Sequence, residues 1–334
     1  PGWAVLFQIQ HLRAGGGRRT ARVRKADLKN SPYFEQAALM LRVIPHVTAE
    51  NCFALKGGTA INLFLRDMPR LSVDIDLTYL PLNELRETAL LKISGALARI
   101  AAAVKKAIPG AKVQEARARE PDRITKLVVA VGRTRIKIEP NEVIRGSVFP
   151  AEERELSPRA EEMFELSVTA RMLSVADLYG GKLCAALDRQ HPRDLFDVKI
   201  LLENEGITDG VRKAFIVYLA SHDRPMNELL DPVRKDIRRI YESEFAGMTV
   251  EETMYEDLIA ARETLIAILK KELTDAEKAF LISLKEGQPR WSLLGIEGVE
   301  KLPALQWKLL NIRKLGKEKH AEALEKLRAK LGVK

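Results

Sequence analysis

Two aspartates separated by one residue, Asp74 and Asp76, are the side chains of this chain whose spacing best suits chemistry. They interrupt an apolar run that includes Val73, Ile75 and Leu77, a pattern typical of a strand. Because side chains on a strand alternate between its faces, both carboxylates are expected on one face. Two adjacent carboxylates repel each other unless a cation lies between them. An all-oxygen pair suits Mg²⁺, which is commonly held by one or two carboxylates together with substrate phosphates.

A glycine turn precedes this pair. The sequence Gly57-Gly58-Thr59 follows an apolar lead-in and is itself followed by a short amphipathic segment that includes Ile61 and Phe64. Backbone N–H groups at such a turn, ahead of a helix, favour phosphate binding. We therefore expect Gly57, Gly58 and Thr59 to contact the phosphates of a nucleotide. A phosphate cradle beside a metal pair indicates nucleotide chemistry.

The second candidate block lies further along the chain. A helix is predicted over Met172–Arg189, with Ser174 as its N-cap and Asp177 at the third helical position. Its Gly180-Gly181 pair costs about 1 kcal/mol per glycine relative to alanine, so either close packing or the approach of a ligand would explain it. Lys182 follows, and Pro192 begins a new helix on which Asp194 and Asp197 share one face.

Periodicity and punctuation predict the elements that must position these groups. A helix is expected from Ser31 to before Glu50, a buried strand over Phe53–Leu55, and a polar linker over 111–122. The other predicted elements are a helix over Leu85–Ile108, strands over Ile124–Val131 and Arg135–Val143, and helices over Val211–Ser221, Pro225–Leu230, Val250–Leu273, Asp275–Glu286, Pro303–Lys314 and Lys317–Leu331. Thr249 and Glu252 predict a capping box for the helix that starts at Val250. Trp291 and Trp307 are expected to pack between helices.

Composition limits the classes of protein. The 334 residues carry a formal net charge of +9, which favours a polyanionic partner such as nucleic acid. The two cysteines lie in apolar surroundings and predict reduced core residues of a cytoplasmic protein. Neither a membrane-spanning apolar run nor a convincing secretory signal is evident, and the Walker and GxGxxG patterns are absent. The basic residues 1–29 predict a flexible arm or extension.

The motif KGGTAINLF followed by RLSVDIDLTYLP resembles the first motif of the DNA polymerase β-type nucleotidyltransferases. In detail it resembles the AbiEii-type nucleotidyltransferase toxins of bacterial type IV toxin–antitoxin systems, from about Asn30 onward. The resemblance implies an α/β (α+β) nucleotidyltransferase core with a small mixed sheet over residues 30–205. A mainly α-helical C-terminal domain would follow over residues 206–334.

The resemblance also implies roles for individual residues. A third carboxylate is expected on a neighbouring strand, and Glu139 is the candidate because it alternates with Ile138; Glu142, past Pro140, is the alternative. The family's active-site lysine maps onto Lys182. Its aspartate maps onto Asp194, with Asp197 as the rival. Together, Asp74, Asp76 and Glu139 would hold two Mg²⁺ ions, while Lys182 would neutralise the charge of the triphosphate.

Two further residues are expected near the bound nucleotide. Ser72 has an even offset from Asp74, so it shares the same strand face and is expected to border the site. Asp197 is expected there too, as the rival of Asp194.

The activity implied by the resemblance is transfer of NMP from an NTP to an acceptor, with release of pyrophosphate. The family implies an RNA acceptor, in particular a tRNA 3′ end, and a cognate antitoxin as partner; the positive charge agrees with RNA. Two alternatives remain open. One is transfer of the NMP to a protein hydroxyl, and the other is a module that binds nucleotide without turnover.

Overall fold

The computed structural model describes residues 28–333, in which one mixed sheet carries seven strands in the order β3-β4-β5-β2-β1-β7-β6. β2 and β5 run parallel, as do β1 and β7, whereas the other neighbours are antiparallel. The strands are β1 (Phe53–Lys56), β2 (Asp74–Tyr79), β3 (Lys112–Ala118), β4 (Arg123–Val131), β5 (Thr134–Asn141), β6 (Glu152–Glu155) and β7 (Thr169–Met172). Of the arm predicted over 1–29, residues 1–27 lie outside the described residues.

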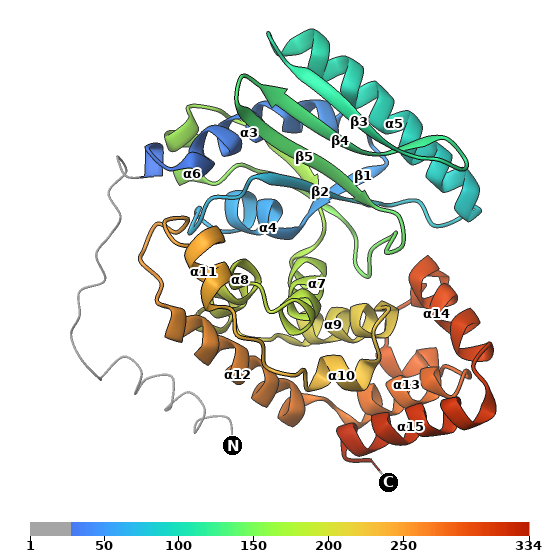
Figure 1. Cartoon of the computed structure of the whole chain (residues 1–334). Helices are drawn as coiled ribbons and strands as arrows, with labels where there is room; N and C mark the ends of the chain where they lie inside the picture. Colours follow the sequence, from blue (N-terminus) through green and yellow to red (C-terminus); the bar gives the residue numbers. More distant parts are fainter. Residues whose placement is uncertain (1–27, 334) are drawn as a thin grey trace.

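Two long helices accompany the sheet. α3 (Pro32–Thr48) packs against β1, β2, β5 and β7, and α5 (Arg86–Ala107) packs mainly against β4 and β3. The predicted N-cap of α3 is confirmed, since Ser31 Oγ accepts a hydrogen bond from the N–H of Tyr33. Apolar residues of α5 recur on its buried face at Ile93, Leu97 and Ile100, as an amphipathic helix requires. Both helices lie in the upper part of Figure 1 with the sheet.

The remaining helices gather mainly in the lower part of Figure 1. α7 (Val175–Asp188) packs closely on α9 (Asp209–Ser221) at Gly180. A Cβ at Gly180 would lie 2.7 Å from both the Ala214 Cβ and the Phe215 nitrogen, so only glycine fits there without a shift of its neighbours. Packing therefore explains Gly180. The other helices are α4 (Gly57–Thr59), η1 (Ala60–Leu65), α6 (Pro158–Phe164), α8 (Pro192–Glu203), α10 (Met226–Leu230), α11 (Arg238–Glu244), α12 (Tyr255–Glu272), α13 (Asp275–Lys285), η2 (Trp291–Leu294), η3 (Val299–Lys301), α14 (Pro303–Arg313) and α15 (Lys317–Leu331).

The α/β core followed by a mainly helical C-terminal part is confirmed, with several local corrections. The linker predicted over 111–122 is wrong, because Lys112–Ala118 forms the edge strand β3. The helix predicted over Met172–Arg189 begins only at Val175, since Met172 ends β7.

The capping box predicted at Thr249 and Glu252 is also wrong. Thr249 forms a bridge with Arg70, and the N–H of Val250 donates to the Pro69 carbonyl. α12 therefore starts at Tyr255, where Asp257 Oδ2 accepts a hydrogen bond from the N–H of Met254.

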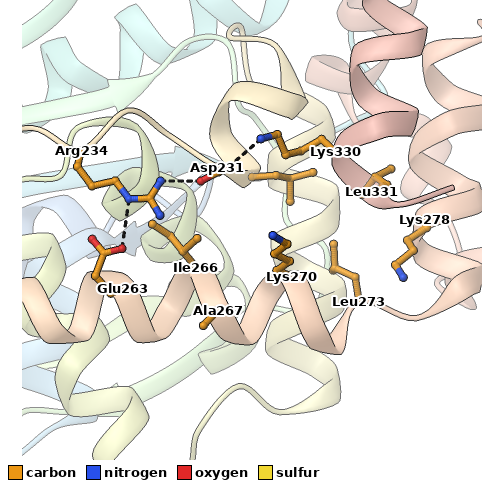
Figure 2. Close-up of a pocket in the computed structure, with 11 residues that line it drawn as sticks. Asp231, Arg234, Glu263, Ile266, Ala267, Lys270, Leu273, Lys278, Lys330 and Leu331 are labelled. Carbon is orange, nitrogen blue, oxygen red and sulfur yellow. Dashed lines mark hydrogen bonds and ion pairs between the residues drawn. The ribbon is translucent and has the colours of Figure 1, made fainter.

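Ion pairs attach the last helix to the helical layer. Asp231, after α10, lies between Arg234 Nη1 at 2.6 Å and Lys330 Nζ of α15 at 2.8 Å (Figure 2). Arg234 also contacts Glu263 of α12 at 3.2 Å. Among residues 28–333, none of the helices is both long and apolar enough to cross a membrane.

Candidate active site

The predicted carboxylates share one face of the sheet. Asp76 on β2 is paired in register with Lys56 on β1 and with Glu139 on β5. Because paired residues of adjacent strands point to the same face, these three side chains form a row, with Asp74 two residues away on the same face. The alternative carboxylate, Glu142, forms an ion pair with Arg123 instead. The register therefore places Glu139, and not Glu142, beside Asp76.

The glycine turn contacts this row directly. Gly57 has φ +71°, and a Cβ on it would lie 2.6 Å from Asp76 Oδ2. Thr59 is buried, and its hydroxyl lies 2.5 Å from the Asp74 carbonyl and 3.0 Å from Ser72 Oγ. The side chains of Thr59 and Ser72 are thus engaged in fixing the start of β2. A phosphate at this turn would meet backbone N–H groups and not the Thr59 hydroxyl.

Gly57→Ala is expected to lower both the free energy of unfolding and the rate of the nucleotidyl transfer that the sequence resemblance implies. The left-handed backbone costs a non-glycine residue about 1–2 kcal/mol, and the new methyl group would also displace the Asp76 carboxylate. Gly110→Ala is the matched control, because Gly110 has φ +75° with nothing within 4 Å of its Cβ position. Urea unfolding should show a loss for both variants, no smaller for Gly57→Ala, whereas the transfer rate should fall at least about tenfold only for Gly57→Ala. Equal transfer rates would contradict this role of Gly57.

The aspartate pair fits a magnesium ion. Burial, followed by the Asp76 carboxylate, raises the pKa of Asp74 above its usual value. Glu139 instead forms an ion pair with Lys126, whose Nζ lies 2.7 Å from Glu139 Oε1. Within residues 28–333, no three His, Cys, Asp or Glu side chains form a group that could hold a metal. Asp74 and Asp76 therefore suit Mg²⁺ that takes its other ligands from phosphates and water, whereas Glu139 would first have to leave Lys126.

Asp74→Asn is expected to stabilise the metal-free protein slightly. We expect Tm to rise by about 2 °C or less at neutral pH, because solvent screens a carboxylate that is 37% exposed. The raised pKa means that the folded state favours protonated Asp74, so the repulsion is relieved as pH falls through that pKa and grows as pH rises. The Tm difference between variant and wild type should therefore vanish in acid. Thermal unfolding across pH, with and without Mg²⁺, measures this; a variant less stable than wild type at neutral pH would contradict it.

A buried ionic cluster joins α7 to α8. Lys182 Nζ lies 2.8 Å from Asp194 Oδ1 and 3.0 Å from Asp197 Oδ2. Burial lowers the pKa of Lys182, but Asp194 and Asp197 outweigh burial, so the net shift is upward. Asp197 also accepts hydrogen bonds from Arg70 at 2.8 and 2.7 Å and from Asn62 at 3.0 Å.

The two rival aspartates differ in their surroundings. Asp194 contacts Arg189, whose side chain is 63% exposed, at 2.8 Å. Burial raises the pKa of Asp194, but Lys182 and Arg189 outweigh it and hold the pKa at about 2. Asp197, in contrast, is bound by Arg70, whose side chain is only 2% exposed. Asp194 thus lies on the side of the cluster that leads to solvent, and Asp197 on the interior side.

A cavity of about 380 Å³ adjoins these groups. Of the predicted site residues, Gly57, Asp76 and Lys182 line it. Gly181 also lines it, so this second helix glycine keeps the α7 wall open. Gly58, Thr59, Ser72, Asp74, Glu139, Asp194 and Asp197 are not part of the lining.

Sequence reasoning missed two cations of this cavity, Lys56 and Arg189. Burial lowers the pKa of Lys56, and Asp76 only partly offsets this. The available signal was the place of Lys56 immediately before the glycine turn, at the end of a buried strand. Arg189 gave no comparable signal, because its contact with Asp194 depends on the bend between α7 and α8.

Asp177 fixes one wall of the cavity. Ser174 Oγ accepts from the N–H of Asp177, which confirms Ser174 as N-cap. The Asp177 carboxylate accepts from the N–H groups of Val148 and Phe149 and from the Tyr218 hydroxyl. These bonds join α7 to α9 and to the segment that follows β5.

Comparisons with known proteins agree with this architecture. Seven chains of solved structures match, among them MenT4, a nucleotidyltransferase toxin from Mycobacterium tuberculosis H37Rv. That match has a TM-score of 0.55 at 15% identity and covers 91% of this chain and 99% of MenT4, so it shows a shared fold. A comparison with curated protein sequences found no match.

The family comparison is more specific. Residues 38–309 match the family model described as "Nucleotidyl transferase AbiEii toxin, Type IV TA system". The matched range contains the glycine turn, the aspartate pair and the Lys182 cluster. Because the match spans most of the sequence, the chain belongs to the AbiEii nucleotidyltransferase toxin family of type IV toxin–antitoxin systems.

Proposed function

We propose that this nucleotidyltransferase adds an NMP from an NTP to an RNA acceptor, in particular a tRNA 3′ end, with Mg²⁺ as cofactor. The observation that supports this most directly is a single cavity lined by Asp76 together with three cations, Lys56, Lys182 and Arg189. The two other carboxylates of its described lining are already engaged, Asp177 by Val148, Phe149 and Tyr218, and Asp188 by Arg224. The Asp76 carboxylate suits a metal, and the cations suit the phosphates that the metal accompanies.

Each group would act at a different point of the nucleotide. Backbone N–H groups at Gly57 and Gly58 would bind the terminal phosphates. Lys56 and Arg189 would neutralise the charge of the triphosphate, since Lys182 is buried between Asp194 and Asp197, whereas Arg189 contacts Asp194 and is largely exposed. Asp194 would orient Lys182 and Arg189, and Asp197 would anchor the cluster to Arg70.

The reaction is an in-line displacement. The acceptor hydroxyl oxygen forms a bond to the α-phosphorus, the bond to the β-phosphate oxygen breaks, and pyrophosphate leaves. Up to two Mg²⁺ ions held by Asp74, Asp76 and Glu139 would stabilise the attacking and leaving oxygens. Glu139, once released from Lys126, would accept the proton of the hydroxyl.

Labelled NTPs, Mg²⁺ and either total tRNA or cell protein provide the test. Label on RNA supports the proposal, and chain mapping of the labelled tRNA should locate it at the 3′ end. Label on protein alone would replace RNA by a protein hydroxyl as acceptor. Retained nucleotide binding without label on either would indicate a binding module.

The biological setting follows from the same proposal. Toxins of this family belong to toxin–antitoxin systems, so we infer a cognate antitoxin as partner. A cytoplasmic location would give the enzyme both NTPs and tRNA. Co-expression of the product of the adjacent gene should restore growth if the enzyme is toxic in its host.

A further inference from the structure

A second, larger cavity adjoins the first one. It has a volume of about 620 Å³ and lies between the end of β5, the end of α9 and helices α13 to α15. Asn141, Ile144 and His222 line both cavities, so these residues form the boundary between the two. Asn141 is two residues beyond Glu139 on β5, about 7 Å along the strand. We call this space the α14 cavity.

An exposed aromatic ring marks the α14 cavity. Trp307 is 53% exposed, so the prediction that it packs between helices is wrong, whereas Trp291 does pack on Phe280 at 5.7 Å between ring centroids. Val143 is 50% exposed and Leu315 is 39% exposed, and both line the cavity beside Trp307. A flat indole at the rim of an open cavity offers a surface on which a planar group can stack.

The charge of the α14 cavity is positive. Lys285, Lys308 and Lys319 line it, and Asp223 is the only acidic residue among the described residues of the lining. Lys308 Nζ donates to the backbone carbonyls of His222 and Arg224, which are uncharged partners. Burial, followed by the charge of Lys285, lowers the pKa of Lys308 to about 8, and burial lowers the pKa of Lys285. A bound anion would relieve both costs.

A third cavity, of about 340 Å³, lies in the helical layer around Asp231, Arg234 and Lys330, and no aromatic residue is part of its described lining. There Arg234 and Lys330 are already paired with Asp231, and Arg234 also with Glu263 (Figure 2). The exposed Trp307 ring beside Lys308 and Lys319 therefore distinguishes the α14 cavity.

We propose that the α14 cavity binds the end of a single-stranded RNA acceptor, with a nucleobase stacked on Trp307 and a neighbouring phosphate held by Lys308 and Lys319. The inference rests on the proposed function, because it supplies the acceptor for the nucleotide cavity beside it. Aromatic stacking with lysines along the backbone is the mode by which proteins hold single strands without reading their sequence. A protein acceptor would not require both a free aromatic face and three lysines.

Binding of a labelled single-stranded hexaribonucleotide to the full chain, measured by anisotropy without NTP or Mg²⁺, tests the site. Trp307→Ala should raise Kd at least about fivefold, the low end expected for loss of one stacked base, while Trp307→Phe should largely restore it. The double variant Lys308→Met/Lys319→Met should make the negative slope of log K against log salt shallower by about 0.7 for each lost phosphate contact. Lys326→Met, an exposed lysine of α15 paired with Glu322, is the matched control and should change neither quantity.

The outcomes separate this site from the proposed function. Unchanged Kd and slope in these variants would overturn the site, even if label still reaches RNA. If Trp307→Ala weakens oligonucleotide binding but wild type labels only protein, the function fails while the site stands. If these variants instead lose binding to an unstructured peptide while their RNA binding is unchanged, the cavity binds protein and the inference is overturned.

Discussion

Asp76→Ala is expected to reduce nucleotide transfer by about 10³-fold or more while leaving the protein folded. Asp76 is the aspartate that lines the nucleotide cavity, and its register partners are Lys56 and Glu139. A metal ion at a transferring phosphoryl group supplies several kcal/mol of charge stabilisation, and each 1.4 kcal/mol is about tenfold in rate. Single-turnover transfer with labelled NTP measures the loss.

The folded state of this variant is checked independently. Its thermal unfolding without Mg²⁺ should stay cooperative with a Tm within about 4 °C of wild type, because the lost repulsion of Asp74 is offset by the lost attraction to Lys56. The rise in Tm that Mg²⁺ and NTP give wild type should be lost. Asp122→Ala, which removes an exposed aspartate paired with Arg117 beyond β3, is the control and should retain full transfer. More than a tenth of wild-type transfer in Asp76→Ala would refute the metal role of this residue.

Asp197→Ala is expected to be the most destabilising single change in the candidate site. Its carboxylate accepts two hydrogen bonds from Arg70 and one from Asn62, and it lies 3.0 Å from Lys182. Removing one partner of a buried ion pair leaves an uncompensated charge and costs about 3–5 kcal/mol. We expect the free energy of unfolding in urea to fall by about that amount. A loss below about 1 kcal/mol would contradict the anchoring role.

Asp197→Asn separates charge from volume and gives a pH signature. Burial raises the pKa of Asp197, but Arg70 and Lys182 outweigh it, so the net shift is downward. The stability that the carboxylate contributes is therefore present above the ordinary aspartate pKa and is lost as pH falls through the lowered one. The stability gap between wild type and Asp197→Asn should shrink in strong acid. Asp122→Ala should leave the urea midpoint unchanged.

A comparison of Asp194→Asn with Asp197→Asn separates the rival aspartates. Asp194→Asn should lower the transfer rate strongly and the free energy of unfolding less than Asp197→Asn does, because Asp194 holds Lys182 and Arg189 toward the cavity. Asp197→Asn should show the larger loss of unfolding free energy and the smaller loss of transfer rate, which would agree with the interior position of Asp197. The assignment of either residue to catalysis stays a prediction until both rates are measured.

The local pattern of the sequence determined much of the core. Period-two alternation around Asp74 and Asp76 was enough to place both carboxylates on one strand face, because that alternation is a property of the backbone alone. Caps at Ser31 and Ser174 were equally readable, since a side chain two or three residues away satisfies the helix N–H groups. The division of the chain near Glu205 stays a prediction.

Elements that depend on position in the sheet were harder to predict. β3 carries no fully buried residue, because it pairs with β4 on one side only and the face toward α5 is half-buried at most. An edge strand of this kind has the polar composition of a linker. The predicted start of α12 was wrong for a similar reason. Thr249 pairs with Arg70 and the N–H of Val250 bonds to the Pro69 carbonyl, so neither residue begins a helix.

The sequence by itself determined that a carboxylate pair follows a glycine turn, and the family resemblance to which this led is confirmed by the match over residues 38–309. Only the tertiary structure decided which groups join that pair. The register of β2 against β5 places Glu139, and not Glu142, beside Asp76, and the fold brought Lys56 and Arg189 to the cavity and left Trp307 exposed. The physical reason is that local patterns fix which face of an element a side chain occupies, whereas contacts between elements depend on long-range pairing that no local window contains.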